Sequence, residues 1–168
     1  AIDYTVFLDS LETGSINRSR RETVLAGGKG VNVSRMLRSL GQESTVLGFV
    51  AGFTGAALEQ GLERDGIRTD FVRLERGLTR INVKIRSGEE TDINARGPEI
   101  TEADVERLFE KLKSLRPGDT LVLAGSIPQS LPSDIYERIL ARLAGRGVRF
   151  VVDATGDLLL LSLRFAPF

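Results

Sequence analysis

The chain has 168 residues, of which 41% are hydrophobic and 27% are charged, ordinary values for a single globular domain. Lysine plus arginine equals aspartate plus glutamate at 23 each, which argues against a dedicated nucleic-acid binder and against a polybasic membrane surface. Histidine and cysteine are absent, so histidine–zinc sites, Ser-His-Asp triads, thiolate nucleophiles and disulfides are excluded.

No apolar run reaches the roughly 20 residues of a membrane-spanning helix, and no signal peptide is visible. We therefore expect a cytoplasmic protein that binds neither nucleic acid nor membrane. The ends are unlike the polar, loosely held ends of most domains, because residues 1–3 lead directly into a strand-like run and residues 158–168 are apolar. This pattern suggests that the chain is a fragment.

The first predicted elements are strands in residues 4–8 and 15–25. The second of these segments is polar and alternating. Strict alternation is typical of a strand with only one covered face, so these strands are expected outside any fully buried sheet.

The most informative stretch reads Gly27-Gly28-Lys29-Gly30-Val31-Asn32. A helix follows it, because apolar residues recur with helical spacing up to a stop at Gly41, at Val33, Met36, Leu37 and Leu40. Glycine lets a ligand approach the backbone closely, and the helix start leaves the N–H groups of residues 30–32 unpaired. The combination predicts a site for an anion or for several hydroxyls; a plain turn with a solvent-exposed lysine is the alternative.

Further along, residues 45–50 read as a buried strand, and Thr54 is the expected cap of a helix that runs to about Arg64. Residues 79–95 alternate again, with a hairpin turn at 87–90. We expect the alternating parts of the chain, from about 3–25 and 68–96, to form a small separate sheet that serves as a lid or as an oligomer contact.

The rest of the chain alternates helices with buried strands. Thr101 and Ser133 are the expected caps of two amphipathic helices, and residues 121–124 and 150–152 are the expected strands. Strands separated by helices of ten or more residues imply right-handed βαβ units, and therefore an α/β fold with a parallel sheet.

Three turns directly follow buried strands, at residues 52–54, 125–128 and 153–155. Ligands of open α/β sheets bind at the carboxyl ends of the strands, so these turns are expected to share one edge. Ser126 offers a hydroxyl there, and Asp153 is either a ligand group or the N-cap of a helix over residues 157–165. A plain strand-to-helix turn is the alternative for 125–128.

Three charged residues are further candidates. Asp3 would accept hydrogen bonds from sugar hydroxyls if it faced the same edge, and Arg18 could hold a phosphate. Arg80 lies on the polar side of its alternating strand. For all three, a solvent-exposed surface residue is the alternative, and for Arg18 a charged strand edge that resists aggregation.

The nucleotide-binding motifs are absent. If Gly28-Lys29 were the Gly-Lys of the Gly-x4-Gly-Lys-Ser/Thr phosphate loop, its first glycine would be at position 23, which is Thr23. Lys29 is followed by Gly30 and Val31 rather than by Ser or Thr, so this loop does not occur. The dinucleotide fingerprint is incomplete, because Val33 stands where its third glycine would be.

As a whole, the chain resembles the N-terminal part of the PfkB-type, ribokinase-like carbohydrate kinases. The closest likeness is to their phosphosugar branch, which includes 1-phosphofructokinase and tagatose-6-phosphate kinase. The resemblance rests on the order and spacing of residues 1–3, 16–18, 26–35, 48–55, 79–83, 124–128 and 153–157.

The resemblance implies a doubly wound, three-layer αβα fold with a mainly parallel sheet and a small β-sheet lid, incomplete at both ends. It also implies phosphoryl transfer from ATP and Mg2+ to a hydroxyl of a ketose phosphate, most closely conversion of fructose 1-phosphate to fructose 1,6-bisphosphate. In this family the lid often makes the contact of a homodimer.

Substrate-binding residues follow from the same resemblance. Asp3 and Asn32 would bind sugar hydroxyls, and Gly27 and Gly28 would let the backbone close on the sugar. Ser126 would line the same pocket.

The phosphate already on the substrate would be held by Lys29, Arg18 and Arg80, with Arg18 the loosest match. A neutral-sugar kinase has no need of Lys29, so this lysine favours the phosphosugar branch.

One departure is large. The Gly-Ala-Gly-Asp motif that supplies the catalytic aspartate of the family does not occur in the chain, and family members are nearly twice as long. We therefore expect no catalytic residue here and no kinase activity from these residues alone. The alternatives are a tagatose-6-phosphate kinase or 6-phosphofructokinase, a non-catalytic sugar-phosphate-binding module, and an unrelated doubly wound domain with a degenerate site.

Overall fold

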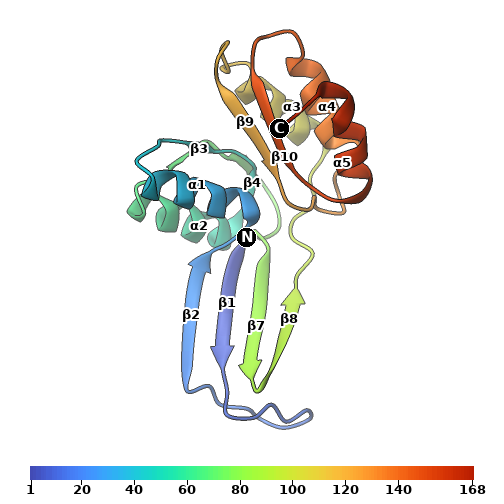
Figure 1. Ribbon diagram of the computed structural model, residues 1–168. Coiled ribbons are helices and arrows are strands. Elements are labelled where there is room, and N and C mark those ends of the chain that lie inside the picture. The colour runs from blue at the N-terminus through green and yellow to red at the C-terminus, as the bar shows by residue number, and fades with distance from the viewer.

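The computed structural model describes residues 1–168 as a four-stranded sheet that projects from an α/β body (Figure 1). The helices are α1 (Lys29–Ser39), α2 (Gly52–Arg64), α3 (Glu102–Leu112), α4 (Ile135–Leu143) and α5 (Gly156–Ser162), with a short 3-10 helix η1 (Leu163–Phe165). The strands are β1 (Ile2–Phe7), β2 (Arg21–Ala26), β3 (Thr45–Val46), β4 (Phe49–Ala51), β5 (Arg68–Thr69), β6 (Val72–Leu74), β7 (Ile81–Ser87), β8 (Glu89–Asn94), β9 (Thr120–Ala124) and β10 (Arg149–Asp153). None of the helices has the length and apolarity that crossing a bilayer requires.

The projecting sheet consists of β2, β1, β7 and β8 in that order. β1 and β7 run parallel at its centre, and each pairs with an antiparallel neighbour on its other side. The expected lid extended from residue 68, but β5 and β6 instead pair in parallel with β3 and β4 in the body. The reason is burial: Val72 and Leu74 are apolar and buried, so they belong to a core rather than to a half-exposed sheet.

The body contains three separate parallel strand pairs, β3 with β5, β4 with β6, and β9 with β10. Parallel pairing of β9 and β10 across α4 confirms the predicted βαβ unit. The single strand expected over residues 45–50 is in fact two short strands, which separate at Gly48, where φ is 147°.

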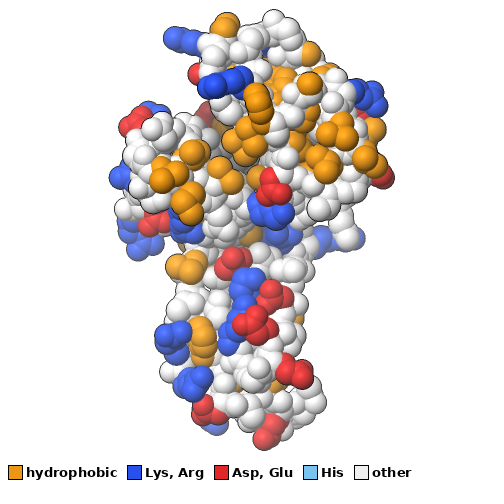
Figure 2. All heavy atoms as spheres, in the orientation of Figure 1, with side chains coloured by type: hydrophobic (Ala, Val, Ile, Leu, Met, Phe, Trp, Pro, Cys, Tyr) orange, Lys and Arg blue, Asp and Glu red, His pale blue; other side chains and the backbone are white.

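Two apolar clusters lie in the body, one of 15 buried residues and one of seven. The larger cluster holds the predicted inward faces of α3 and α4, which are buried at Val105, Leu108, Phe109, Leu112, Ile135, Ile139, Leu140 and Leu143. Figure 2 shows apolar side chains gathered on the body, whereas charged side chains dominate the projecting sheet. The stable core of the chain is therefore in the body.

The helix ends follow the predicted caps only in part. Thr101 forms a complete capping box with Asp104, which confirms the predicted start of α3. In α4 the N-cap is Asp134 rather than Ser133, and α2 begins at Gly52, ahead of Thr54. Thr54 does not cap because its hydroxyl lies inside the body, where it donates to the carbonyl of Thr79 at 3.0 Å.

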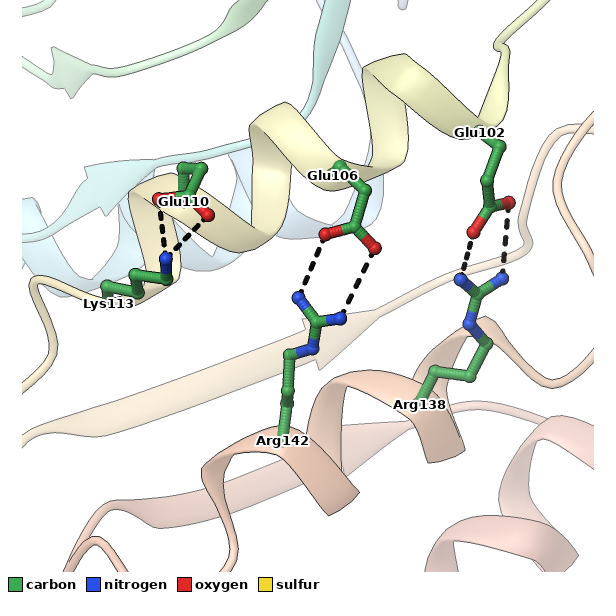
Figure 3. A network of polar contacts seen from close by, with 6 residues as sticks. All are labelled: Glu102, Glu106, Glu110, Lys113, Arg138 and Arg142. Carbon is green, nitrogen blue, oxygen red and sulfur yellow. Dashed lines mark hydrogen bonds and ion pairs between the residues drawn. The ribbon is translucent and has the colours of Figure 1, made fainter.

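Ion pairs join the exposed sides of α3 and α4 (Figure 3). Glu106 accepts from Arg142 at 3.0 and 3.3 Å, and Glu102 accepts from Arg138 one turn away. Both arginines also lie over the ring of Phe109. The next glutamate along α3 pairs with the next arginine along α4, so the two helices run in the same direction. They therefore lie side by side and parallel, as successive crossover helices do.

The apolar face of α1 differs from the prediction. Val31 and Ser34 are its buried residues, whereas Met36 and Leu40 are 62% and 67% exposed. Periodicity identifies an apolar stripe but does not say whether a neighbour covers it, and the small Ser34 lies on the side that packs.

Candidate functional site

The predicted site lies where the projecting sheet meets the body, at the passage from β2 to α1 (Figure 1). Gly28 is the N-cap of α1, with φ at 112°, a conformation that side chains other than glycine rarely adopt. The N–H of Asn32 donates to the carbonyl of Gly28 at 3.0 Å, so the unpaired donors belong to residues 29–31, one position earlier than predicted. Lys29 is the first residue of the helix.

Asp3 is held tightly at the same junction. It faces Asn82 across the parallel pairing of β1 and β7, and the Asn82 Nδ2 donates to Asp3 Oδ1 at 2.8 Å. On the other side, a Cβ added at Gly27 would lie 2.4 Å from the Asp3 Cγ. Gly27 must therefore be glycine for the carboxylate to occupy this place.

The cation of the site, Lys29, lies against the carboxyl ends of β9 and β10. Its Nζ is 3.5 Å from Asp153 Oδ1, and both side chains are 56% exposed. Its stem packs against Gly125, where an added Cβ would lie 3.4 Å from the Lys29 Cβ. An ion pair this long and this exposed is weak, so a ligand phosphate can replace the carboxylate of Asp153 as the partner of Lys29.

Gly125 is fixed in place by its own backbone groups. Its N–H donates to the carbonyl of Asp153 at 2.9 Å, and its carbonyl accepts from the Tyr136 hydroxyl at 3.0 Å. Burial, with a smaller contribution from the charge of Asp153, raises the pKa of Tyr136 to about 12. Tyr136 therefore stays protonated and keeps donating throughout the neutral range.

The structure brings together most of the predicted residues. Asp3, Gly27, Gly28, Lys29 and Asn32 cluster within the β1 start, the end of β2 and the first turn of α1.

Two other predicted residues lie next to residues of the junction in space, although they are distant in the chain. Arg80 directly precedes β7, is half-buried, and accepts the N–H of Ile2 on its carbonyl at 2.8 Å. Ser126 is exposed and follows Gly125, the residue that packs against Lys29.

Arg18 is not brought to the junction. It lies in the loop between β1 and β2, at the far end of the projecting sheet (Figure 1). The ladder from Ile2–Ala26 to Phe7–Arg21 spans five steps, so about 17 Å of strand separates this loop from the junction. Within one copy of the chain, Arg18 and Lys29 therefore do not hold the same phosphate.

The turn at 52–54 also takes a different role from the predicted one. A Cβ at Gly52 would lie 2.8 Å from the carbonyl oxygen of Gly77, and the Thr79 hydroxyl accepts from the N–H of Ala51 at 2.8 Å. This turn therefore fastens the start of β7 to the body. Asp153, in contrast, is not the N-cap of α5, because Thr155 occupies that position.

Sequence reasoning did not assign a role to two residues of the junction, Asn82 and Tyr136. Asn82 reads as one more polar residue of an alternating strand, and Tyr136 as one more apolar residue of an amphipathic helix. The strand register, which puts Asn82 opposite Asp3, is set by tertiary pairing and is not visible in the sequence.

The chain contains no group of three or more aspartate, glutamate, histidine or cysteine side chains that could hold a metal ion. The residues present therefore do not fit a magnesium site of their own, and the polar groups of the junction are suited to hydroxyls and to an anion.

Comparison with known proteins identifies the family. Residues 1–164 match the model of the pfkB family of carbohydrate kinases. The chain belongs to this family. It is 43% identical over its full length to the 1-phosphofructokinase of Bacillus subtilis, and 38% identical to the D-tagatose-1-phosphate kinase of Bacillus licheniformis.

A solved structure gives the same fold. The crystal structure of a protein assigned as a phosphofructokinase, from Staphylococcus aureus, superposes on 99% of the chain with a TM-score of 0.91 and 41% identity. The chain covers 54% of that protein and 55% of each of the two curated relatives. This pfkB chain therefore spans about half the length of the relatives that it matches, and its ribokinase-like fold is a partial one, as predicted.

Proposed function

We propose that this chain carries the sugar-phosphate-binding part of an ATP-dependent phosphosugar kinase, with fructose 1-phosphate as the preferred substrate. The observation that carries the proposal is that one junction contains both a carboxylate fixed by a hydrogen bond, that of Asp3, and the amine of a lysine at a helix start, Lys29. Asp3, fixed by Asn82, suits sugar hydroxyls, and Lys29 suits a phosphate. The 43% identity to a 1-phosphofructokinase supports the choice of sugar.

In phosphoryl transfer, positioning and charge neutralisation contribute more than covalent chemistry by the protein. In this proposal the chain positions the acceptor: Asp3 and Asn32 orient hydroxyls, and Lys29 and Arg80 neutralise the phosphate already on the sugar. ATP and Mg2+ are the implied co-substrates. Their binding groups and the catalytic base are not among the residues described above, so the 168-residue chain alone is expected to be inactive as a kinase.

Calorimetry on the 168-residue chain tests the proposal. Fructose 1-phosphate is expected to bind more tightly than fructose 6-phosphate, tagatose 6-phosphate or unphosphorylated fructose. Lys29→Ala is expected to weaken binding of each phosphosugar by roughly tenfold or more, and Lys113→Ala, which removes an exposed lysine of the α3 end, to leave it unchanged. If none of the three phosphosugars binds to the chain, the proposal is contradicted.

The identity of the sugar is the second question. Because a D-tagatose-1-phosphate kinase is 38% identical to the chain, tagatose 1-phosphate belongs in the same titration. Fructose and tagatose differ only in the configuration of one hydroxyl, so the contact with Asp3 or Asn32 would make the distinction. Tighter binding of tagatose 1-phosphate would assign the chain to that alternative.

We further propose a homodimer formed through the projecting sheet, in a cytoplasmic protein, since ATP is a cytoplasmic co-substrate. Pairing places Val24, Tyr4, Val83 and Ile93 in one row across all four strands. The two ends of this row, Val24 and Ile93, are 63% and 56% exposed, and a second copy could cover them.

Analytical ultracentrifugation tests the dimer. Combining Val24→Glu with Ile93→Glu is expected to give a monomer, because each would bury a charge in the contact. Thr23→Glu, on the opposite face of the same strand, is the matched control and is expected to leave the dimer intact. A monomeric unaltered chain would refute this part of the proposal.

A further inference from the structure

Asn82 occupies an unusual environment for a polar residue of a half-exposed sheet. It is the second residue of β7 and only 7% exposed, while its strand neighbours Ile81 and Val83 are half-buried. Its Nδ2 donates to Asp3 Oδ1 at 2.8 Å. A neutral amide in this place fixes a carboxylate without cancelling its charge, which lysine or arginine would do.

The amide of Asn82 is also incompletely satisfied. Its Oδ1 is buried and has no hydrogen-bond partner. An unpaired buried carbonyl destabilises a fold, and a leucine of similar size would avoid this cost. A buried polar group that lowers stability calls for an explanation, and its contact with Asp3 offers one.

The surroundings of Asp3 show what the contact achieves. The carboxylate is confined between the Asn82 amide and the bare Cα of Gly27, where even a methyl group would overlap it. Only Oδ1 receives a hydrogen bond from the protein, so Oδ2 is left as an acceptor in a fixed direction. An oriented, charged acceptor recognises a hydroxyl with less loss of side-chain freedom than a mobile one.

We propose that Asn82 is a positioning residue for hydroxyl recognition, which holds Asp3 Oδ1 so that Oδ2 is presented to a hydroxyl of the sugar. This inference rests on the proposed sugar-phosphate site and adds a residue to it. It divides the site into two parts: a hydroxyl part made by Asp3 and Asn32, in which Asn82 holds Asp3, and a phosphate part centred on Lys29. Asn82 acts on the first part and not on the second.

Asn82→Leu is the first test, with titrations of fructose 1-phosphate and of inorganic phosphate followed by calorimetry. The variant is expected to bind fructose 1-phosphate at least tenfold more weakly and inorganic phosphate unchanged. Its melting temperature is expected to stay the same or to rise, because the unpaired carbonyl is removed. A purely structural role predicts instead a lower melting temperature and equal losses for both ligands.

Asn82→Asp is the second test and has a different readout, the pH dependence of binding. At pH 7.5 two adjacent carboxylates repel, and binding of fructose 1-phosphate is expected to fall at least tenfold. As the pH is lowered toward 5, the pair shares a proton that serves as a donor to Asp3, so affinity relative to the unaltered chain is expected to recover. The other charged groups near this pair are Arg80, which precedes β7, Lys84 in β7, and the amino group of Ala1, whose pKa is lowered by burial. All three are present in both the variant and the unaltered chain, so the ratio of the two affinities at each pH reports the introduced carboxylate.

The matched control is Asn94→Asp, which makes the same change at the residue of β8 that pairs with Asn82 but is exposed. It is expected to bind fructose 1-phosphate as the unaltered chain does at every pH, because its carboxylate is solvated. Each affinity is divided by that of the unaltered chain at the same pH, which cancels the effect that titration of the ligand phosphate has on binding.

The outcomes separate the two ideas. If the unaltered chain binds fructose 1-phosphate and Asn82→Leu binds it within twofold of the same affinity, the role of Asn82 is refuted while the proposed function stands. If the unaltered chain binds no sugar phosphate, both are refuted.

Discussion

The projecting sheet and the α/β body are stabilised in different ways. The body has a cluster of 15 buried residues between its helices and strands, whereas every residue of β8 is exposed. The strands of the projecting sheet are held by backbone pairing and by cross-strand ion pairs such as Lys84–Asp92. The body therefore has a large apolar core, the outer strand of the projecting sheet has none, and the candidate site lies between the two.

The largest expected effect comes from opening a cavity in the body. Leu140 is fully buried, so Leu140→Ala is expected to lower the free energy of unfolding by about 2–5 kcal/mol. Val24→Ala in the projecting sheet, where the side chain is 63% exposed in a single copy, is expected to lower it by less than about 0.5 kcal/mol at protein concentrations where the chain is a monomer. Urea denaturation measures both. A loss above about 1 kcal/mol for Val24→Ala that grows with protein concentration would mean that another copy covers the sheet.

The next effect concerns the contact between α4 and the site, and it depends on pH. The pKa of Tyr136 is raised in the folded chain to about 12. An acid with a raised folded pKa gives its full contribution to stability below its unfolded pKa, near 10, and loses it as the pH rises to 12. Unfolding measured across this window is expected to show a loss that approaches about 2–3 kcal/mol, and the loss is expected to be absent in Tyr136→Phe. An equal loss in Tyr136→Phe would assign the pH dependence to another group.

At the junction itself, Gly27→Ala is expected to act on binding more than on folding. The new methyl group would overlap the Asp3 carboxylate and displace it from Asn82. Binding of fructose 1-phosphate is expected to weaken at least tenfold, about 1.4 kcal/mol. Gly61→Ala is the matched control: its Cβ would lie 3.9 Å from the Cβ of Ala26, an ordinary contact, so the substitution is expected to stabilise α2 and to leave binding unchanged. Equal losses for both variants would remove the special role of Gly27.

Much of the body could be predicted from the sequence, because its elements are determined by local patterns. The stripe of α3 and its Thr101 cap are both visible in the spacing of residues and are confirmed. The position of residues 68–74 was predicted wrongly, since two strands of two and three residues carry too short a pattern to show which sheet they join.

The candidate site could be predicted as a list of residues but not as a set of contacts. Glycine and lysine in sequence indicated the start of α1, and the resemblance supplied Asp3. The contact of Asp3 with Asn82 joins residues 79 positions apart, and that of Lys29 with Asp153 joins residues 124 apart. Such contacts depend on strand pairing and on how the sheet meets the body, which local periodicity does not encode.

The smallest expected effect distinguishes the exposed ion pairs of the two regions. Hydrogen bonds from Lys84 and Arg86 lower the pKa of Asp92 in the sheet, and a hydrogen bond from Arg138 lowers that of Glu102 in the body. A lowered folded pKa contributes stability above the unfolded pKa, near 4, that is lost as the pH falls through the folded value. Because both pairs are exposed, Asp92→Asn and Glu102→Gln are each expected to lower the melting temperature by only about 2 °C or less, and high salt is expected to cancel the difference.

These two substitutions are expected to differ in their effect on local opening, which amide hydrogen exchange measures. Arg138 also lies over the ring of Phe109, and α3 has a buried face that does not involve Glu102, so amide exchange in α3 is expected to stay slow in Glu102→Gln. β8 has no buried side chain to replace the lost contacts of Asp92, so the amides that pair β7 with β8 are expected to exchange faster in Asp92→Asn. Hydrogen exchange followed by mass spectrometry measures both segments in one experiment. Unchanged exchange in β7 and β8 would mean that backbone pairing or a covering partner, rather than the ion pairs, holds the edge of the projecting sheet.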